Sequence, residues 1–281
     1  MAFNKIKSYA KINIALNIIS KNSFLHKIES VVKFVSLHDD IFIKKIKSNK
    51  HSISFYGKFS DHIGKDNTVY KLLKILEKKK LLKKQKFQIR INKKIPQKAG
   101  LGGGSMNAAN ILKYFIKKKI IKISRKEALA ICTLIGSDVM LGLYLSNSIL
   151  TSRNEVRCFK NCKRFYILII KPNFGCSTKE IYSRVKQFTK PRFNKPNKRM
   201  FNLNFLKNES NNLEPIAFSK YPKLRTIKLY LENLLNPVFV RMTGSGSALI
   251  VYYRSKEICE NAKKKFDKKY KNYWCIASKT I

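Results

Sequence analysis

The sequence predicts an α+β fold in two domains, and three observations support this prediction. The chain has 281 residues, about twice the length of a typical domain. Apolar residues make up 44% and charged residues 27%, which suffices for a buried core. From residue 166 onward the elements follow the order strand, helix, helix, strand, strand, helix, strand, which favours an antiparallel sheet with helices on one face. We place the domain boundary near residue 155, between domains 1–155 and 156–281.

In the first domain, β-branched and loosely alternating runs predict short strands. These strands are residues 10–19, 31–35, 41–46, 52–56, 87–91 and 148–151. Asp66-Asn67 is a candidate cap for a helix with one apolar face. A second helix opens from the glycine-rich segment near residue 100, and Ser124 and Glu127 have the spacing of a capping box for a third.

In the second domain, a continuous apolar run predicts a buried strand over 166–171, and Ser177 is a candidate cap for the next helix. The remaining predicted elements are helices at 222–235 and 256–269 and strands at 238–242, 248–253 and 273–279. Residues 186–212 are rich in Lys, Asn and Pro, so we expect a long mobile connection there.

The charge is strongly basic, with 60 Lys and Arg against 16 Asp and Glu, a net charge of +44. A basic chain can bind nucleic acid, but lysine outnumbers arginine more than fourfold and is scattered along the whole chain. We interpret this as a compositional bias, compatible with attraction of an anionic small substrate. No apolar run approaches the roughly 18 residues of a membrane span, so an integral membrane protein is excluded.

The six cysteines form no C-x-x-C pair and no second pair at zinc spacing, and they are too sparse for a disulfide scaffold. We therefore expect reduced thiols in a cytosol. The N-terminal residues lack the layout of a signal peptide and of a long transit peptide. A bacterial cytoplasm is the predicted location.

The most informative segment is Pro96–Ala109, PQKAGLGGGSMNAA, with four glycines in five residues before a helix. Glycine allows close approach of the backbone to a ligand, and a helix N-terminus offers free N–H groups. The segment lacks the GxxxxGK[ST] pattern, and Ser105 stands where G-x-G-x-x-G needs its third glycine. It predicts an anion cradle, with a flexible hinge as the alternative.

Three further motifs each have an ordinary structural explanation. Lys11, in a strand as Ala-Lys-Ile-Asn, could extend outward to solvent. Asp138, in Gly-Ser-Asp-Val after an apolar helix, could be an N-cap. The Thr-Gly-Ser-Gly-Ser turn at 243–247 could be a plain hairpin connection.

Taken together and in this order, the four motifs resemble the GHMP kinase superfamily. Within it, the chain is most similar to the branch that acts on 4-diphosphocytidyl-2-C-methyl-D-erythritol, in the non-mevalonate isoprenoid pathway. The features that indicate this branch are Lys11 with Asn13, His26, Asp66-Asn67, the long GLGGGS form of the loop, and Ser177 to Tyr182. The resemblance extends from about residue 7 to about residue 250.

The resemblance implies a ribosomal-protein-S5-like N-terminal domain and a ferredoxin-like C-terminal domain. It implies an enzyme that transfers the γ-phosphate of ATP, with Mg²⁺, to the 2-hydroxyl of that substrate and releases ADP. The expected partner is a small-molecule substrate, and no nucleic-acid or membrane partner is expected. The expected assembly is a monomer or weak homodimer.

The resemblance also implies roles for single residues. Asp138 would be the catalytic base, and Lys11 would lie beside it and the hydroxyl. His26 would hydrogen-bond the cytosine edge, Tyr182 would stack on the ring, and Asn13 would contact the substrate near its reacting end.

The nucleotide would be held by the glycine-rich segment and one asparagine before it. Ser105 is a candidate ligand for phosphate or Mg²⁺, and no other metal ligand is assigned. The residues implied are Asn67, Pro96, Gln97, Lys98, Ala99, Gly100, Leu101, Gly102, Gly103, Gly104, Ser105 and Met106.

Three departures from the family pattern stand out. Phe24-Leu25-His26 replaces Gly-Tyr-His, Met106 replaces the second serine of Gly-Ser-Ser, and Met140-Leu141-Gly142 replaces a segment with proline and aromatics. An inactive homologue and a sister GHMP kinase for another alcohol are therefore alternatives. The net charge of +44 adds a third, a basic RNA-binding protein.

Overall fold

The computed structural model describes residues 2–22, 26–64 and 66–281. It divides the chain into two compact units. The first comprises Met1–Ala10, Leu37–Pro96 and Gly102–Leu145, and the second comprises Lys11–Ser36, Gln97–Leu101 and Ser146–Ile281. The boundary predicted near residue 155 is a single cut in the sequence, and these interleaved units do not test it.

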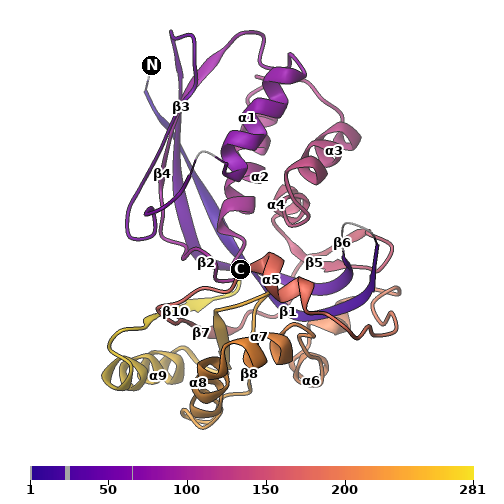
Figure 1. The fold of residues 1–281 in the computed structure, drawn as a ribbon, viewed down its shortest axis with the longest axis vertical. Helices are drawn as coiled ribbons and strands as arrows, with labels where there is room; N and C mark the ends of the chain where they lie inside the picture. The colour runs from indigo at the N-terminus through magenta and orange to yellow at the C-terminus, as the bar shows by residue number, and fades with distance from the viewer. Residues whose placement is uncertain (1, 23–25, 65) are drawn as a thin grey trace. The chain divides into compact units, whose positions relative to one another are not determined.

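The first unit packs helices against a sheet, as Figure 1 shows for α1 to α4 beside β3 and β4. The end of β2 (His26–Ile46) pairs antiparallel with β4 (Lys86–Asn92), and β3 (Ser52–Tyr56) pairs parallel with β4. The helices are α1 (Thr68–Lys78), α2 (Gly103–Lys117), α3 (Arg125–Ile135) and α4 (Val139–Tyr144). Apolar side chains of these strands and helices form one buried cluster.

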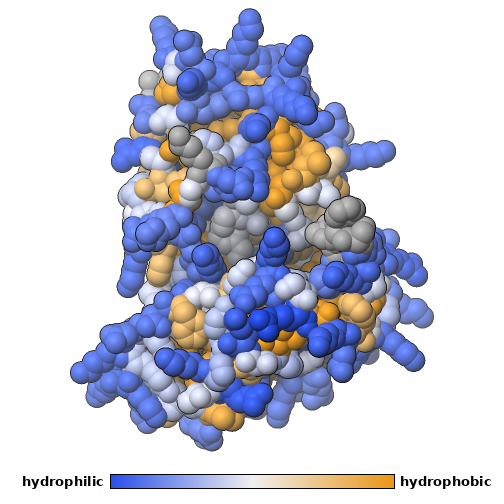
Figure 2. Space-filling view, viewed as in Figure 1, coloured by the Kyte–Doolittle hydropathy of each residue, from blue (hydrophilic) through white to orange (hydrophobic). Residues whose placement is uncertain are grey.

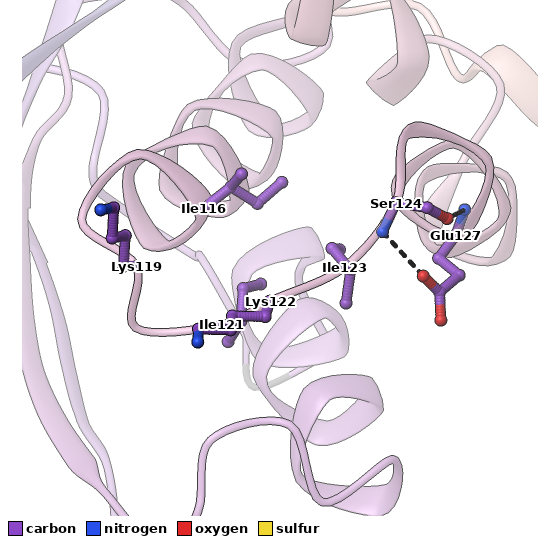
Figure 3. Close-up of a pocket in the computed structure, with 7 residues that line it drawn as sticks. All are labelled: Ile116, Lys119, Ile121, Lys122, Ile123, Ser124 and Glu127. Carbon is purple, nitrogen blue, oxygen red and sulfur yellow. Dashed lines mark hydrogen bonds between the residues drawn. The ribbon is translucent and has the colours of Figure 1, made fainter.

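The predicted caps in this unit are confirmed. The Oδ1 of Asn67 accepts the backbone N–H groups of Val69 and Tyr70 at 3.1 Å, which satisfies two donors at the start of α1. Ser124 and Glu127 form the reciprocal capping box of α3, drawn as dashed lines in Figure 3.

The second unit contains a four-stranded antiparallel sheet in the order β10-β7-β9-β8. The strands are β7 (Tyr166–Lys171), β8 (Phe239–Met242), β9 (Leu249–Tyr253) and β10 (Trp274–Lys279). Numbered within the sheet the order is 4-1-3-2, which is the ferredoxin-like arrangement. Helices α8 (Pro222–Glu232) and α9 (Lys256–Lys269) share its buried apolar cluster. The predicted α+β fold with an antiparallel sheet is confirmed.

The second unit also holds the start of β2, which pairs with β5 (Asn147–Leu150), and β6 (Val156–Phe159), which pairs with β5. β1 (Asn4–Lys21) pairs with β2, and both strands contribute residues to each unit. Strand β6 and the short helix α4 had no clear pattern in the sequence.

One prediction about β2 is wrong. We expected two strands, 31–35 and 41–46, but His26–Ile46 is a single strand. The polar residues between the two predicted strands suggested a break. They are accommodated because each finds a partner: Ser36 Oγ lies 2.9 Å from Ser278 Oγ, and Asp39 and Asp40 pair with lysines of the first unit.

The expectation of a long mobile connection at 186–212 is also wrong. This segment carries the 3-10 helix η1 (Lys198–Phe201) and helix α6 (Leu203–Lys207), and α7 (Glu214–Lys220) follows it. Phe193 and Phe201 are fully buried, and the Glu29 carboxylate accepts the backbone N–H groups of Arg192 and Phe193. A few apolar residues among many Lys and Asn anchor the segment.

Hydrophilic side chains cover most of the face shown in Figure 2, in both units, and they do not gather over one element. No helix among residues 2–22, 26–64 and 66–281 is both long and apolar enough to cross a membrane.

Candidate active site

The first half of the glycine-rich segment, residues 97–101, packs against the turn after β8. Backbone N–H groups of Cys176 and Ser247 both donate to the Lys98 carbonyl at 3.2 Å, and Ala248 donates to Ala99 at the same distance. Gly100 has φ +71°, and a Cβ there would lie 2.0 Å from the Thr243 carbonyl oxygen. Only glycine fits this position, on steric and conformational grounds.

The second half of the segment forms the start of α2. Gly102 is the N-cap, with φ 68° and ψ 14°, and no side chain caps the helix. The first N–H groups of α2 therefore have no acceptor within the helix. Thr68 Oγ1 donates to the Gly104 carbonyl at 2.6 Å, which fixes this turn. Free N–H groups at a helix N-terminus suit an anion, so this geometry is compatible with the predicted anion cradle, which stays a prediction.

Lys11 is buried in the second unit, so the alternative of a lysine extending to solvent is wrong. Its Nζ donates to Asn13 Oδ1 at 2.5 Å, and its backbone N–H donates to the Leu101 carbonyl at 3.1 Å. The Asn13 side chain donates in turn to Ser30 Oγ at 2.8 Å. This network holds the Lys11 ammonium in one place.

Thr243 joins the strand of Lys11 to the glycine-rich segment. Its Oγ1 accepts the backbone N–H of Asn13 at 2.9 Å and donates to the Gly100 carbonyl at 3.2 Å. The structure therefore brings together three of the four sequence motifs within the second unit. Sequence reasoning placed Thr243 only in a turn, and the Thr-Gly-Ser-Gly pattern is the signal that points to its role.

Asp138 lies at the N-cap position of α4 but makes no capping hydrogen bond, and its φ and ψ of −75° and −17° are helical. Its side chain is half-buried. Helix α4 packs tightly on α2: a Cβ on Gly142 would lie 2.5 Å from Ala109 Cβ and 3.1 Å from Met106 Sδ. Within the first unit, Asp138 therefore lies at the start of α4, and α4 packs against α2, the helix that begins in the glycine-rich segment.

His26 and Tyr182 come together in the second unit, with ring centroids 5.1 Å apart and planes at 46°. Tyr182 lies in α5 (Thr178–Ser183), which Ser177 caps as predicted. Burial, and to a smaller extent Lys21, lowers the pKa of His26, which favours the neutral imidazole. Its Nε2 is buried and has no hydrogen-bond partner among the described residues. Leu25 lies outside them.

Several residues predicted to hold ATP can offer only their backbone. Pro96, Ala99, Leu101 and Met106 are buried, and Met106 Sδ lies near Gly142 in the packing of α4 on α2. The Asn67 side chain caps α1 and donates to the Gly64 carbonyl at 2.7 Å. In contrast, the remaining predicted residues keep some exposure: Gln97, Lys98, Gly100, Gly102, Gly103, Gly104 and Ser105.

The pocket in Figure 3 lies between the end of α2 and the start of α3 and contains none of the predicted site residues. No group of three or more His, Cys, Asp or Glu side chains able to hold a metal occurs in the described parts of the chain.

Comparison with known proteins now identifies the class. Residues 67–144, which include the whole glycine-rich segment and Asp138, match the sequence profile of the GHMP kinases N terminal domain. The chain is 53% identical over 277 residues to 4-diphosphocytidyl-2-C-methyl-D-erythritol kinase of Pelagibacter ubique strain HTCC1062, covering 99% of each chain. This chain belongs to the 4-diphosphocytidyl-2-C-methyl-D-erythritol kinase family.

Two solved structures agree in fold. A 4-(cytidine 5'-diphospho)-2C-methyl-D-erythritol kinase matches with a TM-score of 0.78 at 21% identity, covering 99% of both chains. A homoserine kinase from Cytophaga hutchinsonii matches with a TM-score of 0.72 at 15% identity, covering 100% of this chain and 95% of the other. At these identities the likeness shows the fold alone, which kinases with different acceptors share.

Proposed function

We propose that this protein phosphorylates the 2-hydroxyl of 4-diphosphocytidyl-2-C-methyl-D-erythritol with ATP, releasing ADP, as a step of isoprenoid biosynthesis. The full-length 53% identity to a kinase named for this substrate carries the proposal. Two features of the chain support it: the uncapped helix N-terminus of the glycine cradle and the buried, oriented Lys11.

In the proposed reaction, the substrate oxygen attacks the γ-phosphorus, the bond from that phosphorus to the ADP oxygen breaks, and Asp138 accepts the hydroxyl proton. Lys11 stabilises the negative charge that develops on the attacking oxygen. Asn13 accepts a hydrogen bond from the Lys11 ammonium and thereby orients it, in addition to the contact with the substrate proposed for Asn13.

ATP fits the residues present, because the backbone N–H groups at the start of α2 suit phosphate oxygens. Mg²⁺ would supply charge neutralisation on the phosphates. Mg²⁺ is commonly held by substrate phosphates, waters and one or two protein oxygens, so the absence of a three-ligand cluster in the described residues fits it. The Ser105 hydroxyl is the candidate protein oxygen.

For the substrate base, we propose His26 and Tyr182. A neutral imidazole whose buried Nε2 has no partner among the described residues can form a hydrogen bond with the cytosine edge. The Tyr182 ring offers an aromatic face on which the base can stack.

The test is a coupled ADP-release assay with Mg-ATP and three separate acceptors: 4-diphosphocytidyl-2-C-methyl-D-erythritol, mevalonate and homoserine. We expect turnover with the first alone. Asp138→Asn is expected to lower kcat by a factor of about 10² to 10⁴ while Mg-ATP still binds. Asp267→Asn, at a surface ion pair on α9, is the matched control and should keep full activity.

Turnover with mevalonate or homoserine instead would favour a sister kinase. Wild-type turnover in Asp138→Asn would remove the proposed base.

We further propose a cytoplasmic enzyme that is a monomer or weak homodimer, without nucleic-acid partners. Fractionation of cells, sedimentation over a concentration series, and RNA binding at physiological salt test these three statements. Sub-micromolar RNA binding with a steep salt dependence would contradict the last.

A further inference from the structure

A buried carboxylate lies beneath the second half of the glycine-rich segment. Asp39 in β2 is fully buried and accepts four donors. Its Oδ1 accepts the backbone N–H groups of Lys94 at 2.8 Å and Ile95 at 2.9 Å. Its Oδ2 accepts Asn107 Nδ2 at 2.9 Å and the Nζ of Lys93. We call Asp39, Lys93 and Asn107 the Asp39 cluster.

The donors to Asp39 come from both covalent ends of the glycine-rich segment. Lys93, Lys94 and Ile95 immediately precede it, and Asn107 lies near its other end, after the glycines and in the second turn of α2. One carboxylate therefore ties the entry and the exit of the segment to the same point on β2. All of these residues belong to the first unit.

The cluster reaches the first residue of α2. A Cβ built on Gly103 would lie 3.3 Å from Lys93 Nζ and 3.0 Å from Ile95 Cγ2. The ion pair thus lies directly under the turn whose N–H groups form the anion cradle. A shift of Lys93 or Ile95 would move that turn.

Stability alone gives little reason for this arrangement. A protein with a buried ion pair is often no more stable than the same protein with well-packed apolar residues at those positions. Asn107 Oδ1 is buried and has no hydrogen-bond partner in the described chain, which carries a desolvation cost. The hydrogen bond that the Asn107 side chain donates to Asp39, which holds α2 to β2, therefore explains why an amide stands at this position.

We propose that the Asp39 cluster is a positioning unit for the triphosphate of ATP. It acts through the backbone of residues 95–105 and does not touch the nucleotide. Phosphoryl transfer depends on donors fixed in place before the substrate binds, and two tethered ends provide this. The inference rests on the proposed function, because it assumes that ATP binds the glycine cradle.

The test uses the full chain with two variants. Asn107→Leu removes one tether but leaves the Asp39 carboxylate paired with Lys93, so the protein should still fold. The KM for ATP should rise at least about fivefold, corresponding to the loss of one ordinary hydrogen bond, with the KM for the acceptor unchanged. Asp39→Asn should raise the KM for ATP further and also lower stability, because it leaves Lys93 unneutralised.

Asp40→Asn is the matched control. Asp40 is the next residue of the same strand, is also buried, and pairs with Lys5 and Lys94 side chains, but it has no link to Asn107. It should leave the KM for ATP unchanged. An Asn107→Leu protein with a wild-type KM for ATP, or with equal rises in both KM values, would overturn the inference. Wild-type protein that bound no Mg-ATP would overturn the proposed function along with it, so the two failures are distinguishable.

Discussion

Lys33 is a fully buried lysine held by neutral groups in the second unit. Its Nζ donates to the Lys163 carbonyl at 2.6 Å and lies 4.8 Å from the centroid of the Phe165 ring. Burial lowers the pKa of Lys33 from 10.5 to about 8; Cys162 opposes this shift and Arg164 adds to it. The charged form is therefore costly in the folded protein.

This shift has a defined sign for stability. Below about pH 8 Lys33 is protonated in both folded and unfolded chains, so the full cost is present. Between about pH 8 and 10.5 the unfolded chain binds more protons, and the contribution of Lys33 to stability improves as pH rises. We expect Lys33→Met to stabilise the protein by about 1 to 3 kcal/mol at pH 7.

Urea unfolding of wild type and Lys33→Met from pH 7 to pH 10 measures this difference. The gain should shrink steadily above pH 8. Lys160→Met, at an exposed lysine, should show no pH-dependent difference. A gain that is constant with pH would show that packing, and not the charge, is responsible.

At the residue scale, the sequence supplied the candidate site residues but not the contacts that hold them in place. Lys11, Asn13 and Gly100 stand in short motifs, and the structure places them together in the second unit. Thr243 could not be assigned its role, because its bond to Asn13 joins positions 230 apart in sequence. Asp39 gave no signal, since a carboxylate in Leu-His-Asp-Asp looks like part of a turn.

At the scale of elements, the contact between α2 and α4 depends on one glycine. Gly142→Ala would place a methyl group 2.5 Å from Ala109 Cβ, so one helix must move. We expect a loss of about 1 to 3 kcal/mol in the free energy of unfolding. Because α4 carries Asp138, kcat should fall as well.

Gly64→Ala is the control for this substitution, because a Cβ there meets nothing within 4 Å. Thermal unfolding and the ADP-release assay are run on both variants. An unchanged midpoint for Gly142→Ala would mean that the two helices have room to separate.

The predicted elements held where local signals were strong. Helices α1 and α3 were predicted from their capping residues, and strand β7 was predicted from its continuous apolar run. The centre of β2 and the segment 186–212 were not, because their polar composition resembles loop. Their structure comes from partners distant in sequence, such as Glu29 for the backbone of Phe193.

At the scale of the whole molecule, the net charge of +44 is the dominant feature. Mutual repulsion of many like charges destabilises a compact chain, and salt screens it over about 10 Å at 0.1 M. We expect the unfolding midpoint to rise by several degrees when NaCl is raised from about 20 mM to about 300 mM. The KM for ATP should rise over the same range, because attraction of the polyanion is screened as well.

Differential scanning calorimetry over the salt series measures the first effect, with sucrose in place of salt as the uncharged control. A midpoint that falls as NaCl is added would contradict the repulsion argument.

The interleaving of the two units has a consequence for the order of events during synthesis. Strands β1 and β2 leave the ribosome before residues with which they pair: Ser30 pairs with Leu150, and Phe34 and Val35 pair with Ile281 and Thr280. At about 5 to 20 residues per second, the early strands wait several seconds or more for these partners. The second unit is therefore closed only after residues 280 and 281 have emerged, and until then its first two strands expose edges that a nascent-chain chaperone would recognise.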